Sequence, residues 1–167
     1  MTAQVSPSPQ SSGADHPAPR WLDADEQATW RAWLYSNQLL QEQLGRELAR
    51  EAGMPHAYYE ILVQLSEAPE RRMRMSQLAD SCLSSRSRLS HAVSRLEERG
   101  WIRREVCAED GRGQLAVLTD EGFAALAAAA PVHVESVRSH VFDQLTPEQV
   151  AAMRDIGETL MRHLNQY

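Results

Sequence analysis

The stretch LSSRSRLSHAVSRLEERGWIRRE, residues 83–105, holds the side chains in this sequence that are best suited to bind a polyanion. If residues 85–99 form a helix, Arg88, His91 and Arg95 lie three and four positions apart and share one face. An arginine can donate two hydrogen bonds to a guanine edge, and serine or histidine can bond to a base or a phosphate. The spacing therefore predicts a cationic helix face able to contact duplex DNA.

The composition of the chain restricts such a contact to a local surface. The 167 residues carry a formal net charge of −6, yet residues 71–104 contain nine arginines against three acids. A chain that is acidic as a whole is not a general polyanion binder, so this segment would have to supply the contacts. For the helix alone, a solvated face without any partner explains the charges equally well.

The segments beside this helix favour DNA binding. A short helix and a turn are expected before it, and Gly100 suits a left-handed helix end after it. The segments WIRREVC and QLAVLT then have strand character, with AEDGRG as a turn between them, which predicts a hairpin. This is the order of a winged helix-turn-helix, in which the second helix enters the major groove. The apolar face that packs inward is formed by Leu89, Ala92, Val93 and Leu96.

The tip of the predicted hairpin adds a second cationic group. Arg112 lies between two glycines, and an arginine on a narrow loop can enter a minor groove. Asp110 is two residues away and could orient the guanidinium by an ion pair. A solvent-exposed turn residue without a ligand is the alternative for Arg112.

The remaining pattern is helical. Helices are predicted over residues 23–52, up to residues 68–69, from a Ser76 cap onward, from a Thr119 cap through Pro131, which would kink the helix, and from a Thr146 cap to about Leu164. Residues 1–20 are rich in Ser, Pro, Gly and Ala, which predicts a mobile tail. The fold class expected is mainly α with a small β-hairpin wing.

Several other classes of protein are disfavoured. We find no apolar run that would span a membrane and no signal pattern, so a cytoplasmic location is expected. The two cysteines lack metal-ligand spacing, the histidines form no tight ligand cluster, and no cofactor is expected. The sequence also lacks a Gly-rich phosphate loop and a Ser-His-Asp pattern above chance, so an enzyme is not expected.

Residues 85–122, SRSRLSHAVSRLEERGWIRREVCAEDGRGQLAVLTDEG, resemble the MarR family of bacterial transcription regulators. The resemblance rests on a recognition helix that ends in Leu-Glu-x-x-Gly, a wing with Asp-x-Arg and a Leu-Thr-x-x-Gly entry to the next helix. The order of helices extends it over about residues 23–165.

The resemblance implies a homodimer on a pseudo-palindromic DNA site, more readily a repressor than an activator. The segments it implies are a disordered tail at 1–22, a first dimerisation helix at 23–54, a winged helix-turn-helix lobe at 55–118 and C-terminal dimerisation helices at 119–167. A dimer also agrees with the apolar stripes of the terminal helices, which one small lobe could not cover, and it supplies two recognition helices.

The same resemblance, together with the helix faces, gives the candidate DNA-binding residues. They are Arg74, Ser76, Ser85, Arg86, Ser87, Arg88, Ser90, His91, Arg95, Asp110 and Arg112. Arg95 is better placed for phosphate and Arg112 for the minor groove, while Arg103 and Arg104 alternate along a strand, so at most one should face DNA.

The resemblance also implies release from DNA by a small amphipathic or phenolic ligand, bound between the dimerisation helices and the lobe. The candidate lining is Trp30, Trp33, Asn37, His56, Tyr59 and Leu62, for which plain packing is the alternative. Oxidation of Cys82 or Cys107 is a further possible signal, although a buried, inert thiol is the simpler interpretation of each.

One rival function is kept beside the regulator. A winged helix can bind protein through the same surfaces, so a protein-interaction module without specific DNA binding is the alternative. The discriminating residues are Arg88, His91, Arg95 and Arg112.

Overall fold

The structure is a computed structural model that describes residues 19–107 and 113–165. The tail predicted at the N-terminus therefore lies almost wholly outside the described residues, as do Asp110 and Arg112. The chain divides into two units, Met1–Ser36 and Asn37–Tyr167, and helix α1 (Ala24–Ala52) begins in the first and continues in the second.

The described part of the first unit, residues 19–36, consists of a short segment before α1 and the start of that helix. Asp23 accepts a hydrogen bond from the backbone N–H of Glu26, and the Glu26 carboxylate accepts one from the N–H of Asp23. This reciprocal pair satisfies N–H groups that the first turn leaves free, which explains why the helix begins here. The sequence predicted this helix over residues 23–52, and the prediction is confirmed.

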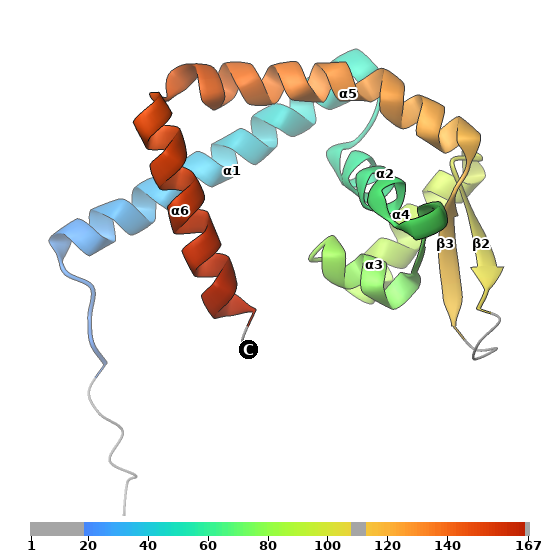
Figure 1. The fold of residues 1–167 in the computed structure, drawn as a ribbon, viewed down its shortest axis with the longest axis horizontal. Helices are drawn as coiled ribbons and strands as arrows, with labels where there is room; N and C mark the ends of the chain where they lie inside the picture. The colour runs from blue at the N-terminus through green and yellow to red at the C-terminus, as the bar shows by residue number, and fades with distance from the viewer. Residues whose placement is uncertain (1–18, 108–112, 166–167) are drawn as a thin grey trace, which may run out of the picture. The chain divides into compact units, whose positions relative to one another are not determined.

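The described part of the second unit continues through ten further helices and strands, coloured in chain order in Figure 1. They are α2 (His56–Glu67), η1 (Pro69–Arg71), β1 (Arg72–Arg74), α3 (Met75–Ser81), α4 (Arg86–Glu98), β2 (Ile102–Val106), β3 (Gln114–Leu118), α5 (Asp120–His140), η2 (Phe142–Gln144) and α6 (Pro147–Leu164). The mainly α fold with a β-hairpin wing is confirmed, and the described residues include no helix long and apolar enough to cross a membrane.

The sheet has three antiparallel strands in the order β1-β3-β2. The hairpin pairs Ile102 with Leu118 and Arg104 with Ala116, as the two strand-like segments predicted. Strand β1 was not predicted, and it pairs Met73 with Ala116 on the other side of β3. Three residues are too few to show a period of two, so this strand depends on pairing that only the folded chain provides.

Because β1 occupies residues 72–74, the Ser76 cap predicted for α3 is wrong. The chain passes from the strand directly into the helix at Met75, and Arg74 is the N-cap residue. The predicted caps of the later helices are correct. Thr119 accepts from the N–H of Gly122 in α5, and Thr146 forms a reciprocal capping box with Gln149 in α6.

The core lies where α2, α3, α4 and the sheet meet. Leu62, Leu65, Leu78, Val93 and Leu96 have no exposed surface. The prediction that one face of α4 packs inward is confirmed, because Leu89, Val93 and Leu96 are buried and Ala92 packs against the same cluster. Gly100 follows α4 with φ +72°, the left-handed geometry expected there.

Candidate nucleic-acid interface

Helix α4 presents its basic residues to solvent because its leucines and valine hold the opposite side in the core. Ser85 caps the helix by accepting a hydrogen bond from the N–H of Arg88. Arg86, Ser87, Arg88 and His91 are exposed, and among the described residues Arg86 and Arg88 form no ion pair. Their guanidinium groups therefore keep their donors for an external acceptor.

Two predicted members of this face are more constrained. Arg95 donates to the Glu98 carboxylate at 2.9 Å, so a phosphate would have to compete with that acid. Ser90 is half-buried, and its carbonyl accepts hydrogen bonds from the Ser94 hydroxyl and from Arg104. Ser90 is thus less accessible than Arg88 or His91.

The residues predicted near the start of α3 do not cap it as expected. Arg74 is the last residue of β1 and is half-buried, whereas Ser76 is exposed in the first turn of α3. Arg74 lines an open hollow together with Gln77 and Asp80.

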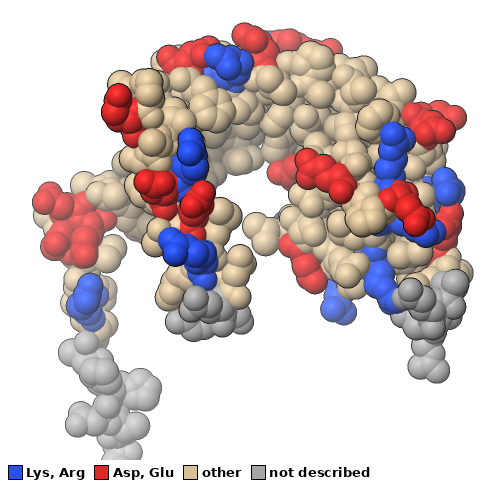
Figure 2. Space-filling model, viewed as in Figure 1, with Lys and Arg blue, Asp and Glu red and all other residues tan. Residues whose placement is uncertain are grey.

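The charge distribution supports a local cationic surface. Figure 2 shows basic side chains along the lower edge of the lobe that holds α3 and α4, with acidic side chains elsewhere on the same face. One arginine of the segment is turned to packing instead. The Arg99 guanidinium lies 5.0 Å from the Trp101 ring centre and 5.5 Å from that of Tyr58.

The two arginines of β2 point in different directions, as the strand period predicts. Arg103 is exposed and pairs with Glu105 at 2.8 Å. Arg104 is directed toward α4, where it contacts Ser90 and Ser94. Asp110 and Arg112, the predicted minor-groove pair, lie outside the described residues.

A separate cavity of about 390 Å³ lies among α1, α2, α5 and the turn between α3 and α4. Of the predicted ligand residues, His56 and Tyr59 line it. Sequence reasoning missed the other residues that we now place there, above all His133 from α5, whose ring centre is 4.5 Å from that of Tyr59 and 5.7 Å from that of His56. No sequence signal links these rings, because they come from different helices.

The other predicted ligand residues lie elsewhere. Leu62 is fully buried in the core, and Asn37 is exposed and does not line this cavity. Trp30 and Trp33 belong to the first unit and have 52% and 44% of their surface exposed.

The Cys82 thiol and the His133 ring at this cavity both have a pKa that is shifted toward the uncharged form. Burial, followed by the nearby Glu60 carboxylate, raises the pKa of Cys82 to about 11, so a reactive thiolate is disfavoured there. Cys107 is buried. Burial, and then the neighbouring His56, lowers the pKa of His133, and its Nδ1 is a buried atom without a hydrogen-bond partner among the described residues.

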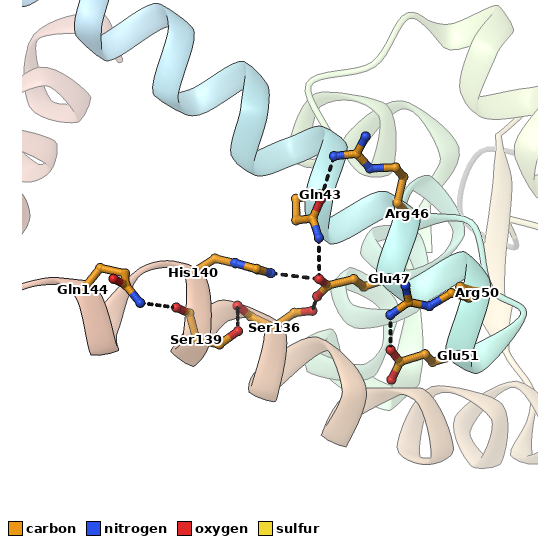
Figure 3. Close-up of polar contacts among 9 residues, drawn as sticks. All are labelled: Gln43, Arg46, Glu47, Arg50, Glu51, Ser136, Ser139, His140 and Gln144. Carbon is orange, nitrogen blue, oxygen red and sulfur yellow. Dashed lines mark hydrogen bonds and ion pairs between the residues drawn. The ribbon is translucent and has the colours of Figure 1, made fainter.

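A polar cluster links the second half of α1 to α5, as Figure 3 shows. The Glu47 carboxylate accepts hydrogen bonds from the Ser136 hydroxyl, from His140 Nε2 at 2.9 Å and from the Gln43 amide. These bonds, in that order, lower the pKa of Glu47 to about 2. Because Ser136 and His140 each contact the carboxylate, the histidine is not placed between them as a base for the serine.

The two histidines that are two turns apart on α5 face different groups. His133 faces the aromatic rings of the cavity, and His140 faces Glu47. The described residues contain no group of three or more His, Cys, Asp or Glu that could hold a metal ion.

Comparison with known proteins places this lobe among transcription regulators. A profile of the MarR family matches residues 52–113, which include α3, α4 and β2. The structure of a MarR family transcriptional regulator from Streptomyces coelicolor, solved in complex with DNA, superposes with a TM-score of 0.83. That protein is 52% identical in sequence, and the match covers 89% of this chain and 93% of the other.

Two further relatives agree. AbsC, a MarR family transcriptional regulator from Streptomyces coelicolor, has a TM-score of 0.81 and 42% identity over 89% of this chain and all of the other. The HTH-type transcriptional regulator PecS of Dickeya dadantii is 32% identical over 89 residues, which make up 53% of each chain. The chain therefore spans about half the length of that curated relative.

Proposed function

The chain belongs to the MarR family, and we propose from this premise that it regulates transcription by binding a specific double-stranded DNA sequence as a homodimer. The observation that carries the proposal is the exposed face of α4. Arg86, Arg88 and His91 extend to solvent from a helix whose other side is anchored by buried Leu89 and Val93. A rigidly held helix with free donors is what base recognition in the major groove requires.

The proposed roles follow from exposure and donor chemistry. Arg88 and His91 read base edges, Arg95 binds phosphate after leaving Glu98, and the N-terminal residues Ser85, Arg86 and Ser87 contact bases or nearby phosphates. Arg74 and Ser76 bind phosphate, Ser90 adds a contact at the edge of the face, and Arg112, oriented by Asp110, enters the minor groove.

A second copy of the chain is the proposed cover for the terminal helices. In α6, Met153, Ile156, Leu160 and Leu164 follow one another at helical spacing and are 40–66% exposed. Burial of such a stripe is favourable by about 25 cal/mol per Å² of apolar surface. We therefore keep 23–54 and 119–167 as the dimerisation segments, 55–118 as the DNA-binding lobe and 1–22 as a tail.

The regulator acts as a repressor in this proposal, since a dimer that covers promoter DNA excludes other proteins from it. It binds a site with two similar half-sites, because a two-fold symmetric protein presents the same helix twice. Its place of action is the cytoplasm, where bacterial DNA lies.

The cavity beside α2 is proposed as the effector site, with a phenolic or similarly amphipathic ligand. Tyr59 and the two imidazole rings supply flat walls, and His133 Nδ1 supplies a buried polar atom that a ligand hydroxyl could satisfy. Leu83 and Cys82, from the turn directly before α4, line the same cavity. A ligand that displaces this turn would shift α4, which gives a route to release from DNA.

The DNA-binding proposal is tested by selection and then by titration. The full chain is used to recover duplexes from a random-sequence pool about 30 base pairs long, which spans two half-sites one helical turn apart. The recovered sequence is titrated with wild type, Arg88→Ala, Arg112→Ala and, as a control for loss of charge, Arg50→Ala, whose side chain pairs with Glu51. We expect Arg88→Ala and Arg112→Ala to weaken binding and Arg50→Ala to leave it near wild type. Failure of the wild type to enrich any sequence would contradict the proposal.

The effector proposal has its own test, with phenol and benzoate as probes. Each probe is titrated into the complex of protein and selected duplex, and DNA release is followed by fluorescence anisotropy. Release from wild type that is weakened in His133→Leu and Tyr59→Phe supports the cavity. Release that is unchanged in both variants places the effector elsewhere.

The protein-interaction alternative is tested by replacing Arg88, His91, Arg95 and Arg112. If these residues are needed for duplex binding, the alternative fails. If their replacement changes nothing while a protein partner still binds, the regulator proposal fails. The Glu47 arrangement supplies no serine activated by histidine, so we propose no catalytic activity.

A further inference from the structure

Arg104 in β2 differs from the other arginines of the segment in where its side chain goes. Its side chain is 23% exposed, whereas that of the adjacent Arg103 is 57% exposed and pairs with Glu105. The two residues alternate on the strand, so Arg103 points to solvent and Arg104 points toward the recognition helix α4.

The contacts of Arg104 span two turns of α4. Its Nη2 donates to the carbonyl of Ser90 and to the hydroxyl of Ser94, each at 2.9 Å. The Ser94 hydroxyl in turn donates to the Ser90 carbonyl at 3.0 Å, which closes a ring of three hydrogen bonds. Glu97 accepts from the backbone N–H of Arg104 at 3.3 Å and lies 3.8 Å from its Nε.

Apart from Ser90, which is also proposed to contact DNA at the edge of its face, these contacts occupy a side of α4 to which no other role is assigned. Ser90, Ser94 and Glu97 are spaced four and three apart and therefore share one side of the helix. The buried leucines lie about a quarter turn to one side, and the face of Arg88 and His91 lies about a third of a turn to the other, at 100° per residue. The hydrogen bonds from Arg104 to Ser90 and Ser94, called the Arg104 brace below, therefore lie on a third side of α4. There they oppose rotation of the helix about its own axis, which the apolar contacts alone restrain less sharply.

The chemistry of the brace suits positioning better than stability. A half-buried guanidinium gives up hydration, and its Nε is a buried atom without a hydrogen-bond partner among the described residues. Such an ion pair adds little net stability, because desolvation offsets much of the attraction. Its planar, directional donors do, however, define one geometry for the groups that it joins.

We infer that Arg104 is a positioning residue for DNA recognition. It fixes the rotation of α4 about its own axis and the position of α4 relative to the wing strand β2. The inference rests on the proposed DNA-binding function and names a residue that acts through Arg88 and His91 rather than on DNA itself. Base contacts depend on placement within about 0.5 Å, whereas attraction to phosphates tolerates displacement. Loss of the brace therefore lowers specific binding more than non-specific binding.

The test measures the ratio of specific to non-specific affinity with the full chain. The duplexes are the sequence selected by wild type from the random pool and a scrambled duplex of equal length and composition. Arg104→Gln removes the brace, and Ser94→Ala removes one of its acceptors while keeping every charge. Arg103→Gln is the matched control, because it removes the same charge from the next residue of the strand.

We expect Arg104→Gln to lower the ratio about tenfold, a loss of about 1.4 kcal/mol, and Ser94→Ala to lower it about threefold. The slope of log affinity against log salt on the selected duplex should stay that of wild type in both, because no phosphate contact is removed. Arg103→Gln should leave the ratio unchanged, whatever its effect on overall affinity.

Two outcomes would overturn the inference. If Arg104→Gln lowers the affinity for both duplexes equally, and reduces the salt slope by the amount expected for about one phosphate contact, Arg104 binds phosphate directly. An unchanged ratio in Ser94→Ala would show that the brace does not set the geometry, and this variant decides the matter if Arg104→Gln fails to fold, as judged by circular dichroism. Failure of wild type to select any sequence would instead remove the proposed function.

Discussion

At the scale of single residues, the entry to α5 shows how one motif joins two segments. Thr119 caps the helix through the N–H of Gly122, and its own N–H donates to the carbonyl of Trp101 at 3.1 Å. The missing side chain at position 122 lets that carbonyl approach, since a Cβ there would lie 2.1 Å from the Trp101 oxygen. The Leu-Thr-x-x-Gly pattern thus holds the start of α5 against Trp101, in the segment between α4 and β2.

Gly122→Ala is therefore expected to destabilise the fold by about 1–3 kcal/mol, since backbone has to move to admit one methyl group. Gly45→Ala is the control, because a Cβ at that helical position would meet its nearest atom, in His56, at an ordinary 3.8 Å. It should be neutral or stabilising by up to about 1 kcal/mol. Urea unfolding of the three proteins checks this, and equal midpoints for wild type and Gly122→Ala would show that the contact can relax.

The position of a single residue could be predicted where it depends on neighbours in the sequence, and could not where it depends on packing between distant segments. The exposed positions of Arg88 and His91 were predictable, because residues three or four apart on one helix share a face. The position of His133 beside Tyr59 was not, because the two rings are brought together by packing of α2 against α5. The brace at Arg104 was half predictable: the strand period indicated that it points away from Arg103, but not what it would contact.

At the scale of elements, the Glu47 cluster connects two helices by side chains. Its carboxylate receives donors from Ser136, His140 and Gln43, and these hold its pKa at about 2. An unfolded glutamate has a pKa near 4.3, so the folded state binds its proton less readily. The resulting stabilisation is complete above that unfolded value and is lost as the pH falls from about 4.5 toward 2.

Glu47→Gln should accordingly lower the free energy of unfolding by about 1–3 kcal/mol at pH 7, since an amide offers one acceptor oxygen to three donors. The difference from wild type should shrink at pH 3, where the wild-type carboxylate begins to lose its advantage. Glu51→Gln, an exposed glutamate one turn away that pairs with Arg50, should change stability by less than about 1 kcal/mol. A Glu47→Gln deficit that is constant from pH 7 to pH 3 would assign the loss to packing.

Elements themselves were predictable where they are long or capped. The spans of α1, α4 and α6 were predictable from apolar spacing, and the start of α6 also from its Thr146 cap, whereas the caps at Asp23 and Ser85 came from the structure. Strand β1 was missed because three residues carry no pattern of their own, and its existence depends on the edge that β3 offers. Missing it displaced the predicted start of α3 by two residues and assigned its cap to Ser76 instead of Arg74.

At the scale of the whole molecule, helix α6 is poorly covered by the rest of its own unit. None of its residues is buried, and Ile156 and Leu160 are 55% and 45% exposed. The stripe was visible in the sequence, but its exposure required the structure, because an apolar stripe is equally expected where a helix covers its own core. In the proposed homodimer a second copy of the chain would supply this cover, together with the second recognition helix that a two-fold DNA site requires.

Leu160→Glu should therefore convert the proposed dimer to a monomer, since it places a charge within the apolar stripe. Ala151→Glu is the control, because position 151 is exposed and lies on the opposite side of α6. Light scattering after size-exclusion chromatography should give twice the mass of the 18.8 kDa chain for wild type and Ala151→Glu, and the single-chain mass for Leu160→Glu. Binding of the selected duplex should fall at least about 100-fold in Leu160→Glu, because each half-site then binds independently of the other. A Leu160→Glu protein that stays dimeric would place the interface away from this stripe, whereas a monomer that still binds the full site with wild-type affinity would show that recognition does not need the second copy.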